Sequence, residues 1–110
     1  IHVLGDSIQI APAMPKSGHT ANQHAKTRAA AVVALLQGKE PLAMPIYANT
    51  CYSFVTDEDV VHVASVHRYD AEKKTMVTVA GSGGVPRAGR ELEGRHAPAG
   101  ARNIWADTLA

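Results

Sequence analysis

The chain has 110 residues, which suffices for one small domain with a modest core, and 45% of them are hydrophobic, which excludes a wholly disordered protein. Eleven basic residues stand against ten acidic ones, so the formal net charge of +1 offers no electrostatic basis for binding nucleic acid. The longest apolar run, residues 29–36, is too short to cross a bilayer. We therefore expect neither a nucleic-acid partner nor a membrane span.

The first predicted element is a short apolar strand, Ile1 to Leu4, that runs directly into Gly5 and Asp6. Such a strand places the Asp6 carboxylate at its carboxyl end, which is where ligands bind in open α/β sheets. Asp6 is therefore a candidate to accept hydrogen bonds from sugar-like hydroxyl groups. The alternative from spacing alone is a turn at Gly5 and Asp6, in which Asp6 caps a local group.

A helix is predicted after the loop at residues 7–19, starting at about Thr20. Ser17 or Thr20 is its expected N-cap, and Gly38 is its expected stop. The amino end of such a helix presents unpaired N–H groups, which suit a phosphate or an electron-rich carbonyl. One helix face carries apolar residues and is predicted to pack closely on a sheet: Ala21, Ala25, Ala29, Val32, Val33 and Leu36.

The second half of the chain begins with an extended linker marked by Pro41 and Pro45, which is the predicted boundary between two structural units, residues 1–40 and 41–110. After it the pattern alternates and predicts three strands, at residues 51–55, 60–69 and 75–80. Short polar turns between them indicate an antiparallel meander. A short helix or turn is expected at residues 102–109, so the predicted fold class is α+β.

The six histidines do not predict a metal site. His19 and His24 are five residues apart on a helix and fall on different faces, whereas His62 and His67 are five apart on a strand and point to opposite sides. The segment GSGGVP, residues 81–86, has proline where the dinucleotide-binding fingerprint needs its third glycine, so it predicts a plain turn.

The chain contains one cysteine, Cys51, which cannot form an internal disulfide. One interpretation is a small buried thiol that behaves as an apolar side chain. The other is a thiol whose partner lies in another chain or outside this sequence. The residues alone leave both interpretations open.

Two stretches carry a family resemblance: GDSIQIAPAMPKSGHTANQHAKTRAAAVVALLQGKEP, from Gly5, and NTCYSFV, from Asn49. They resemble the C-terminal part of the flavoprotein subunit of flavocytochrome c sulfide dehydrogenase, a family grouped with the sulfide:quinone oxidoreductases. The segment VTVAGSGGV, from Val77, is similar to the family's late strand and glycine turn. The resemblance implies that residues 1–40 are the last strand and helix of an FAD-binding sheet. It also implies that residues 41–110 form an interface or dimerisation domain, with the phosphate loop in N-terminal domains outside this sequence.

The resemblance also assigns roles to individual residues. Cys51 matches the family's redox-active cysteine, whose partner is a second cysteine in the N-terminal part. Sulfide attacks that disulfide, a persulfide forms, and electrons pass to FAD and then to a c-type cytochrome subunit. Asp6 is implied to contact the ribityl or pyrophosphate part of FAD, and the helix start to face the pyrimidine edge of the ring. The implied cofactor-binding residues are Asp6, Met14, Pro15, Lys16, Ser17 and Gly18.

The implied function is therefore that of an FAD-dependent sulfide dehydrogenase in the periplasm. We expect the isolated chain to bind FAD poorly and to be inactive. Two alternatives remain: a related flavoprotein with a quinone acceptor, and a stand-alone interaction module that dimerises through its sheet edges. The family ending carries an aromatic pair where this chain has Gly100 and Ala101, so Trp105 is either a displaced flavin cover or a core or dimer-contact residue.

Overall fold

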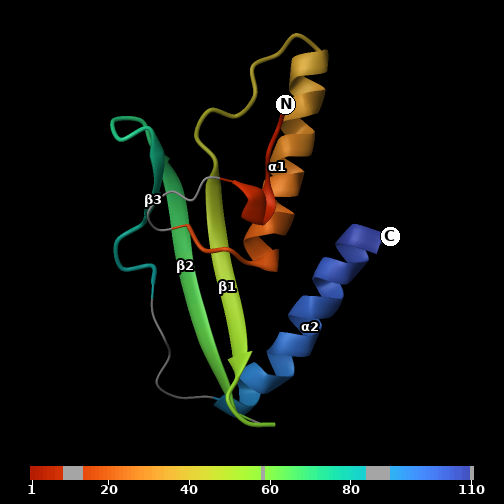
Figure 1. The fold of residues 1–110 in the computed structure, drawn as a ribbon, viewed down its shortest axis with the longest axis vertical. Helices are drawn as coiled ribbons and strands as arrows, with labels where there is room; N and C mark the ends of the chain where they lie inside the picture. The colour runs from red at the N-terminus through yellow and green to blue at the C-terminus, as the bar shows by residue number, and fades with distance from the viewer. Residues whose placement is uncertain (9–13, 58, 84–89, 110) are drawn as a thin grey trace.

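The structure, a computed structural model, describes residues 1–8, 14–57, 59–83 and 90–109. Its sheet and two main helices confirm the α+β class predicted from the sequence (Figure 1). In chain order the elements are the 3₁₀ turn η1 (Gly5–Ser7), helix α1 (Gly18–Leu36), strands β1 (Ile46–Phe54), β2 (Val60–Asp70) and β3 (Thr75–Thr78), and helix α2 (Arg90–Leu109).

The sheet has the strand order β1-β2-β3 with both pairs antiparallel, which confirms the predicted meander. In this register Cys51 lies opposite Val63, and His67 lies opposite Tyr47. Strand β1 begins at Ile46, earlier than expected, because the proline-marked linker ends at Pro45. Proline lacks an N–H group but is tolerated directly before a strand, so its presence did not prevent pairing from the next residue onward.

The predicted ends of the first helix are confirmed. Ser17 is the N-cap, and its side-chain Oγ accepts a hydrogen bond from the Thr20 backbone N–H at 3.1 Å. This contact satisfies one of the N–H groups that a helix start leaves unpaired. Gly38 lies just beyond the last helical turn with φ +68°, a left-handed conformation that glycine adopts without steric cost.

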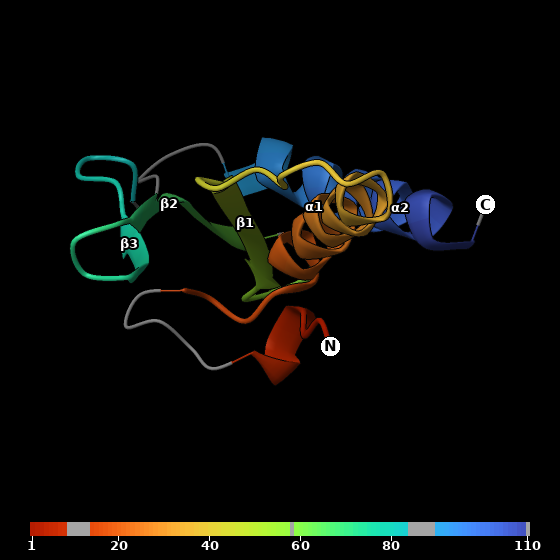
Figure 2. The same cartoon turned by 90° about the horizontal axis from the view of Figure 1, so that it is seen from above.

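The predicted buried face of α1 is wrong. The helix runs beside β1 (Figures 1 and 2) and buries Thr20, His24 and Ala31 instead. The His24 ring packs edge-on against Tyr47, with ring centroids 4.6 Å apart. This face is polar because β1 supplies partners for it: Asn49 for Thr20 and Tyr47 for His24. The hydrophobicity pattern of the helix alone does not show these partners.

The apolar face predicted to lie on the sheet points elsewhere. Ala21, Ala25 and Ala29 line a shallow hollow whose other wall is α2, with Ile104 among its residues. Val33 and the other large residues near the end of α1 are exposed. The alanines thus face α2 across this hollow instead of packing on the sheet, and Ala25 and Ala29 are exposed.

Ile1 to Leu4, predicted as a strand that pairs with strands outside this sequence, form no strand within this chain. These residues belong to no strand, and η1 follows them, with Gly5 at φ +65°. A Cβ atom on Gly5 would lie 3.5 Å from the Ala21 Cβ, so η1 packs directly on α1. A strand needs a neighbouring strand for its hydrogen bonds, and none of the described strands lies next to this segment.

Helix α2 is longer than the predicted helix at residues 102–109, which it includes. Its first part was missed because Gly94, Pro98 and Gly100 all disfavour helix, yet Pro98 lies inside α2. Residues 84–86 of the predicted glycine turn lie outside the described residues. Among the helices that the structure describes, none combines the length and the hydropathy needed to cross a membrane.

Candidate functional site

Cys51 lies in the middle of β1, half-buried and with a free thiol. Side chains alternate along a strand, so Cys51 shares a face of the sheet with Asn49 and Tyr47, the side toward the buried residues of α1. The Cys51 thiol donates to the side-chain Oδ1 of Asn49 at 3.4 Å.

Asn49 connects this strand to the start of α1. It is 4% exposed, and its Oδ1 also accepts from the Ser17 hydroxyl at 2.7 Å and from the Thr20 hydroxyl at 3.4 Å. Ser17 and Asn49 are 32 residues apart in the sequence. The fold therefore brings Cys51 to the amino end of α1 through one buried amide.

At the amino end of α1, some backbone N–H groups are satisfied by Ser17 and others have no hydrogen-bond partner among the described residues. Ser17 satisfies the N–H group of Thr20 with its side chain and that of Ala21 with its backbone carbonyl, at 2.9 Å. The N–H groups of Gly18 and His19 have no hydrogen-bond partner among the described residues. Together with the helix dipole they can stabilise negative charge on a group that faces the helix start.

The other predicted cofactor residues, near the start of α1, differ in how far they are exposed to solvent. Met14 is buried, Pro15 is half-buried and Lys16 is exposed. Asp6 is exposed in η1, and its carboxylate has no partner among the residues that the structure describes. The structure thus joins Cys51 to Ser17 at the helix start, and it leaves the Asp6 carboxylate available on the neighbouring turn.

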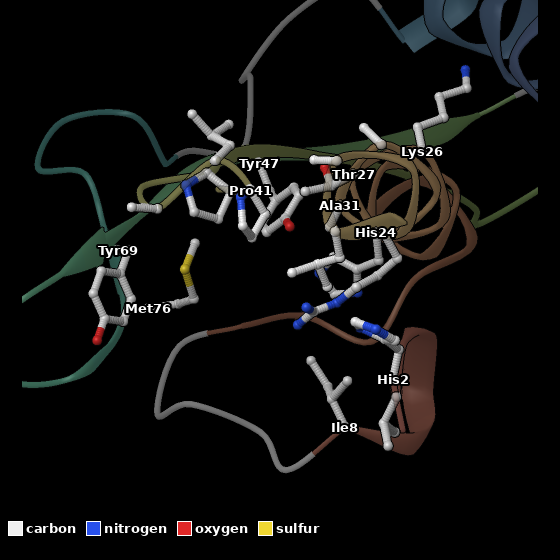
Figure 3. A pocket seen from close by; sticks show the side chains of 18 of the residues that line it. His2, Ile8, His24, Lys26, Thr27, Ala31, Pro41, Tyr47, Tyr69 and Met76 are labelled. Atoms are coloured by element: carbon white, nitrogen blue, oxygen red, sulfur yellow. The ribbon is translucent and has the colours of Figure 1, made fainter. Parts of the chain in front are cut away.

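A cavity of about 680 Å³ extends from Met14 along α1 to the loop before β1 (Figure 3). His24 lines it and is 7% exposed, and its Nδ1 has no hydrogen-bond partner among the described residues. Burial lowers the pKa of His24, and the nearby Arg28 guanidinium lowers it further, so the ring is neutral at pH 7. Sequence reasoning considered His24 only as a metal ligand, although its spacing of four residues from Thr20 was a signal for a shared face.

The histidines in the sheet lie as predicted, on opposite faces. His62 stacks on Tyr52 with ring centroids 4.6 Å apart and an interplanar angle of 11°. The ring of His67 lies on the other face, with Nε2 2.9 Å from the Ser65 hydroxyl. No group of three or more His, Cys, Asp or Glu side chains in the described part of the chain is arranged to hold a metal ion.

Comparison with protein families gives a match over residues 43–109, which is more than half of the chain. The matching family is described as flavocytochrome c sulphide dehydrogenase, flavin-binding. The matched range includes Asn49 and Cys51 but not Asp6 or the segment from Met14 to Gly18. It agrees with the resemblance carried by the sequence motifs, and the chain therefore belongs to the flavin-binding family of flavocytochrome c sulphide dehydrogenase.

Proposed function

We propose that this chain provides one wall of the flavin site and the redox-active cysteine, Cys51, of an FAD-dependent sulfide dehydrogenase. The family match supports a flavoprotein of this type. The observation that carries the proposal is the hydrogen-bonded path from the Cys51 thiol through Asn49 to Ser17 at the amino end of α1. Through that path the Cys51 sulfur is linked to a helix start where the N–H groups of Gly18 and His19 have no partner among the described residues, which supports the proposal.

The described residues fit a flavin. The free N–H groups of Gly18 and His19 suit the electron-rich edge of the isoalloxazine ring, and the unpaired Asp6 carboxylate suits ribityl hydroxyls. Met14 and Pro15 would provide apolar contacts for the ring, and the exposed Lys16 follows Pro15 in the sequence. When bound, FAD would supply the two-electron acceptor for the thiolate that sulfide attack on the disulfide releases, with a c-type cytochrome as the next acceptor.

Cys51 would act through a disulfide with a cysteine outside these 110 residues. Hydrosulfide attacks the Cys51 sulfur, a new S–S bond leaves a persulfide on Cys51, and the old S–S bond breaks. The partner cysteine departs as a thiolate with the electron pair of that bond. The positive end of the α1 dipole favours negative charge that develops nearby. Disulfides persist in oxidising compartments, of which the periplasm is one, so a periplasmic location is part of the proposal.

The test is sulfide oxidation by the protein that carries this chain. We expect Cys51→Ser to lower sulfide-dependent reduction of a c-type cytochrome by about 100-fold or more while flavin absorbance is retained, because the covalent route is closed. Ser53→Ala is the matched control, since Ser53 lies two residues further along β1 on the same face and is exposed. A Cys51→Ser protein that holds flavin and oxidises sulfide at the parental rate would show that the proposal is wrong.

A further inference from the structure

We propose that Asn49 is a positioning residue that holds the Cys51 thiol at the amino end of α1 and restrains its reactivity. The contacts that carry this proposal are all within the described residues. The consequence for sulfide oxidation rests on the proposed function, whereas the effect on the thiol itself does not.

The Asn49 amide oxygen accepts from donors on two different elements. Ser17 and Thr20 approach from α1 at 2.7 and 3.4 Å, and the Cys51 thiol approaches from β1 at 3.4 Å. An amide oxygen has two lone pairs, so three donors share two acceptor positions, and a thiol is the weakest of the three donors. Cys51 is therefore held by a contact that is easily released, while the two hydroxyls keep Asn49 in place.

Among the described neighbours of Cys51, Asn49 is the one that forms a hydrogen bond with the thiol. The cross-strand neighbour of Cys51 is Val63, whose side chain has no hydrogen-bonding group. Asn49 is 4% exposed, so water has little access to replace a lost contact at its oxygen. Without the amide oxygen, the thiol would lose the acceptor that stabilises its protonated form.

The hydrogen bond also affects how Cys51 reacts. A thiolate is the reactive form and has no proton to donate, so the contact to Asn49 Oδ1 must break before Cys51 attacks an electrophile. Removing the acceptor should therefore speed the reaction. Replacing the amide with a carboxylate should slow it, because the carboxylate still accepts from the thiol and its charge opposes a thiolate.

The experiment measures alkylation of Cys51 by iodoacetamide in the reduced, folded protein, followed by mass spectrometry of the Cys51 peptide. We expect Asn49→Ala to react about fivefold faster than the parent, the equivalent of one typical hydrogen bond. We expect Asn49→Asp to react about fivefold slower. Gln23→Ala is the matched control, because Gln23 also links α1 to β1 but does not contact Asn49 or Cys51.

The two Asn49 variants are expected to change the alkylation rate in opposite directions, which distinguishes a positioning role from a merely structural one. If Asn49 only supported the fold, both of its variants would loosen the protein and react faster, as would the control. An Asn49→Asp protein that reacts faster than the parent, or an Asn49→Ala rate equal to that of Gln23→Ala, would overturn the proposal. Asn49→Asp keeps the test decisive if Asn49→Ala does not fold. Because alkylation needs neither flavin nor sulfide, its result is independent of the proposed function.

Discussion

At the residue scale, His67 shows how the sheet accommodates an ionisable side chain. It is 1% exposed, with Nε2 2.9 Å from the Ser65 hydroxyl and Nδ1 3.5 Å from the Thr78 hydroxyl. Burial lowers the pKa of His67, since desolvation disfavours the charged imidazolium. The ring is therefore neutral in the folded protein at pH 7, and two hydroxyl groups serve as its polar neighbours.

This burial predicts a loss of stability in mild acid. The unfolded state takes up a proton on His67 near pH 6.5, whereas the folded state does so only at lower pH. The stabilising contribution is complete above pH 6.5 and is lost as the pH falls from there toward the lower folded pKa. We expect the free energy of unfolding, measured with urea at about pH 7.5 and about pH 5.5, to fall less in His67→Gln than in the parent.

The control for this prediction is His96→Gln. His96 is exposed on α2, so this variant tests whether any histidine-to-glutamine change alters the acid-induced fall. An equal fall in His67→Gln and in the parent would mean that His67 is not a source of the pH dependence.

At the element scale, α1 protects the free edge of β1. The Gln23 side chain donates to the Ala48 carbonyl at 2.6 Å and accepts from the Ala48 N–H at 2.9 Å. His19 Nδ1 lies 3.1 Å from the same carbonyl. The Gln23 amide thus makes the two contacts that a neighbouring strand would make, and unpaired sheet edges otherwise invite pairing with other chains.

Removing this contact should open the edge. We expect Gln23→Ala to destabilise the protein by about 1 to 2 kcal/mol, since it removes two hydrogen bonds. The amide of Ala48 should also exchange hydrogen faster, which NMR can follow at that residue. Gln37→Ala is the matched control, because Gln37 is an exposed residue at the other end of α1. Unchanged exchange at Ala48 in Gln23→Ala would contradict the role of the side chain.

At the scale of the whole molecule, the chain has a small core and an extended shape. The buried apolar residues among those described are Met14, Ala31, Tyr47 and Val60. The Cα radius of gyration is 15.8 Å, compared with about 13 Å for a compact domain of this length. Large apolar residues are exposed at the end of α1 and in the loop that follows, with Leu36 83% and Leu42 72% exposed. Trp105 is also exposed, so within this chain it is not a core residue.

This apolar surface predicts self-association of the purified chain, because exposed apolar side chains favour contacts that remove them from water. We expect sedimentation velocity to show concentration-dependent association, which the double variant Leu36→Lys and Leu42→Lys reduces. Val55→Lys is the control, since Val55 is also exposed but lies at the turn after β1. If the double variant associates as strongly as the parent, the surface at the end of α1 is not the one that mediates association.

Much of the local structure was predictable from the sequence. The N-cap at Ser17 and the stop at Gly38 depend on residues a few positions apart. The meander depends on side-chain alternation and on short turns. The family could also be predicted, because the motif around Cys51 consists of consecutive residues in the sequence. The candidate cofactor residues from Asp6 to Gly18 remain predictions, as does the division of the chain at residue 40.

By itself, then, the sequence determined the caps, the strand alternation and the family, since each is encoded by residues close together in the chain. Only the tertiary structure decided that α1 buries Thr20 and His24 rather than its apolar face, and that Asn49 joins Cys51 to Ser17. The physical reason is that a buried polar side chain is stable only when a partner faces it. That partner lies on another element, and the fold alone brings the two together.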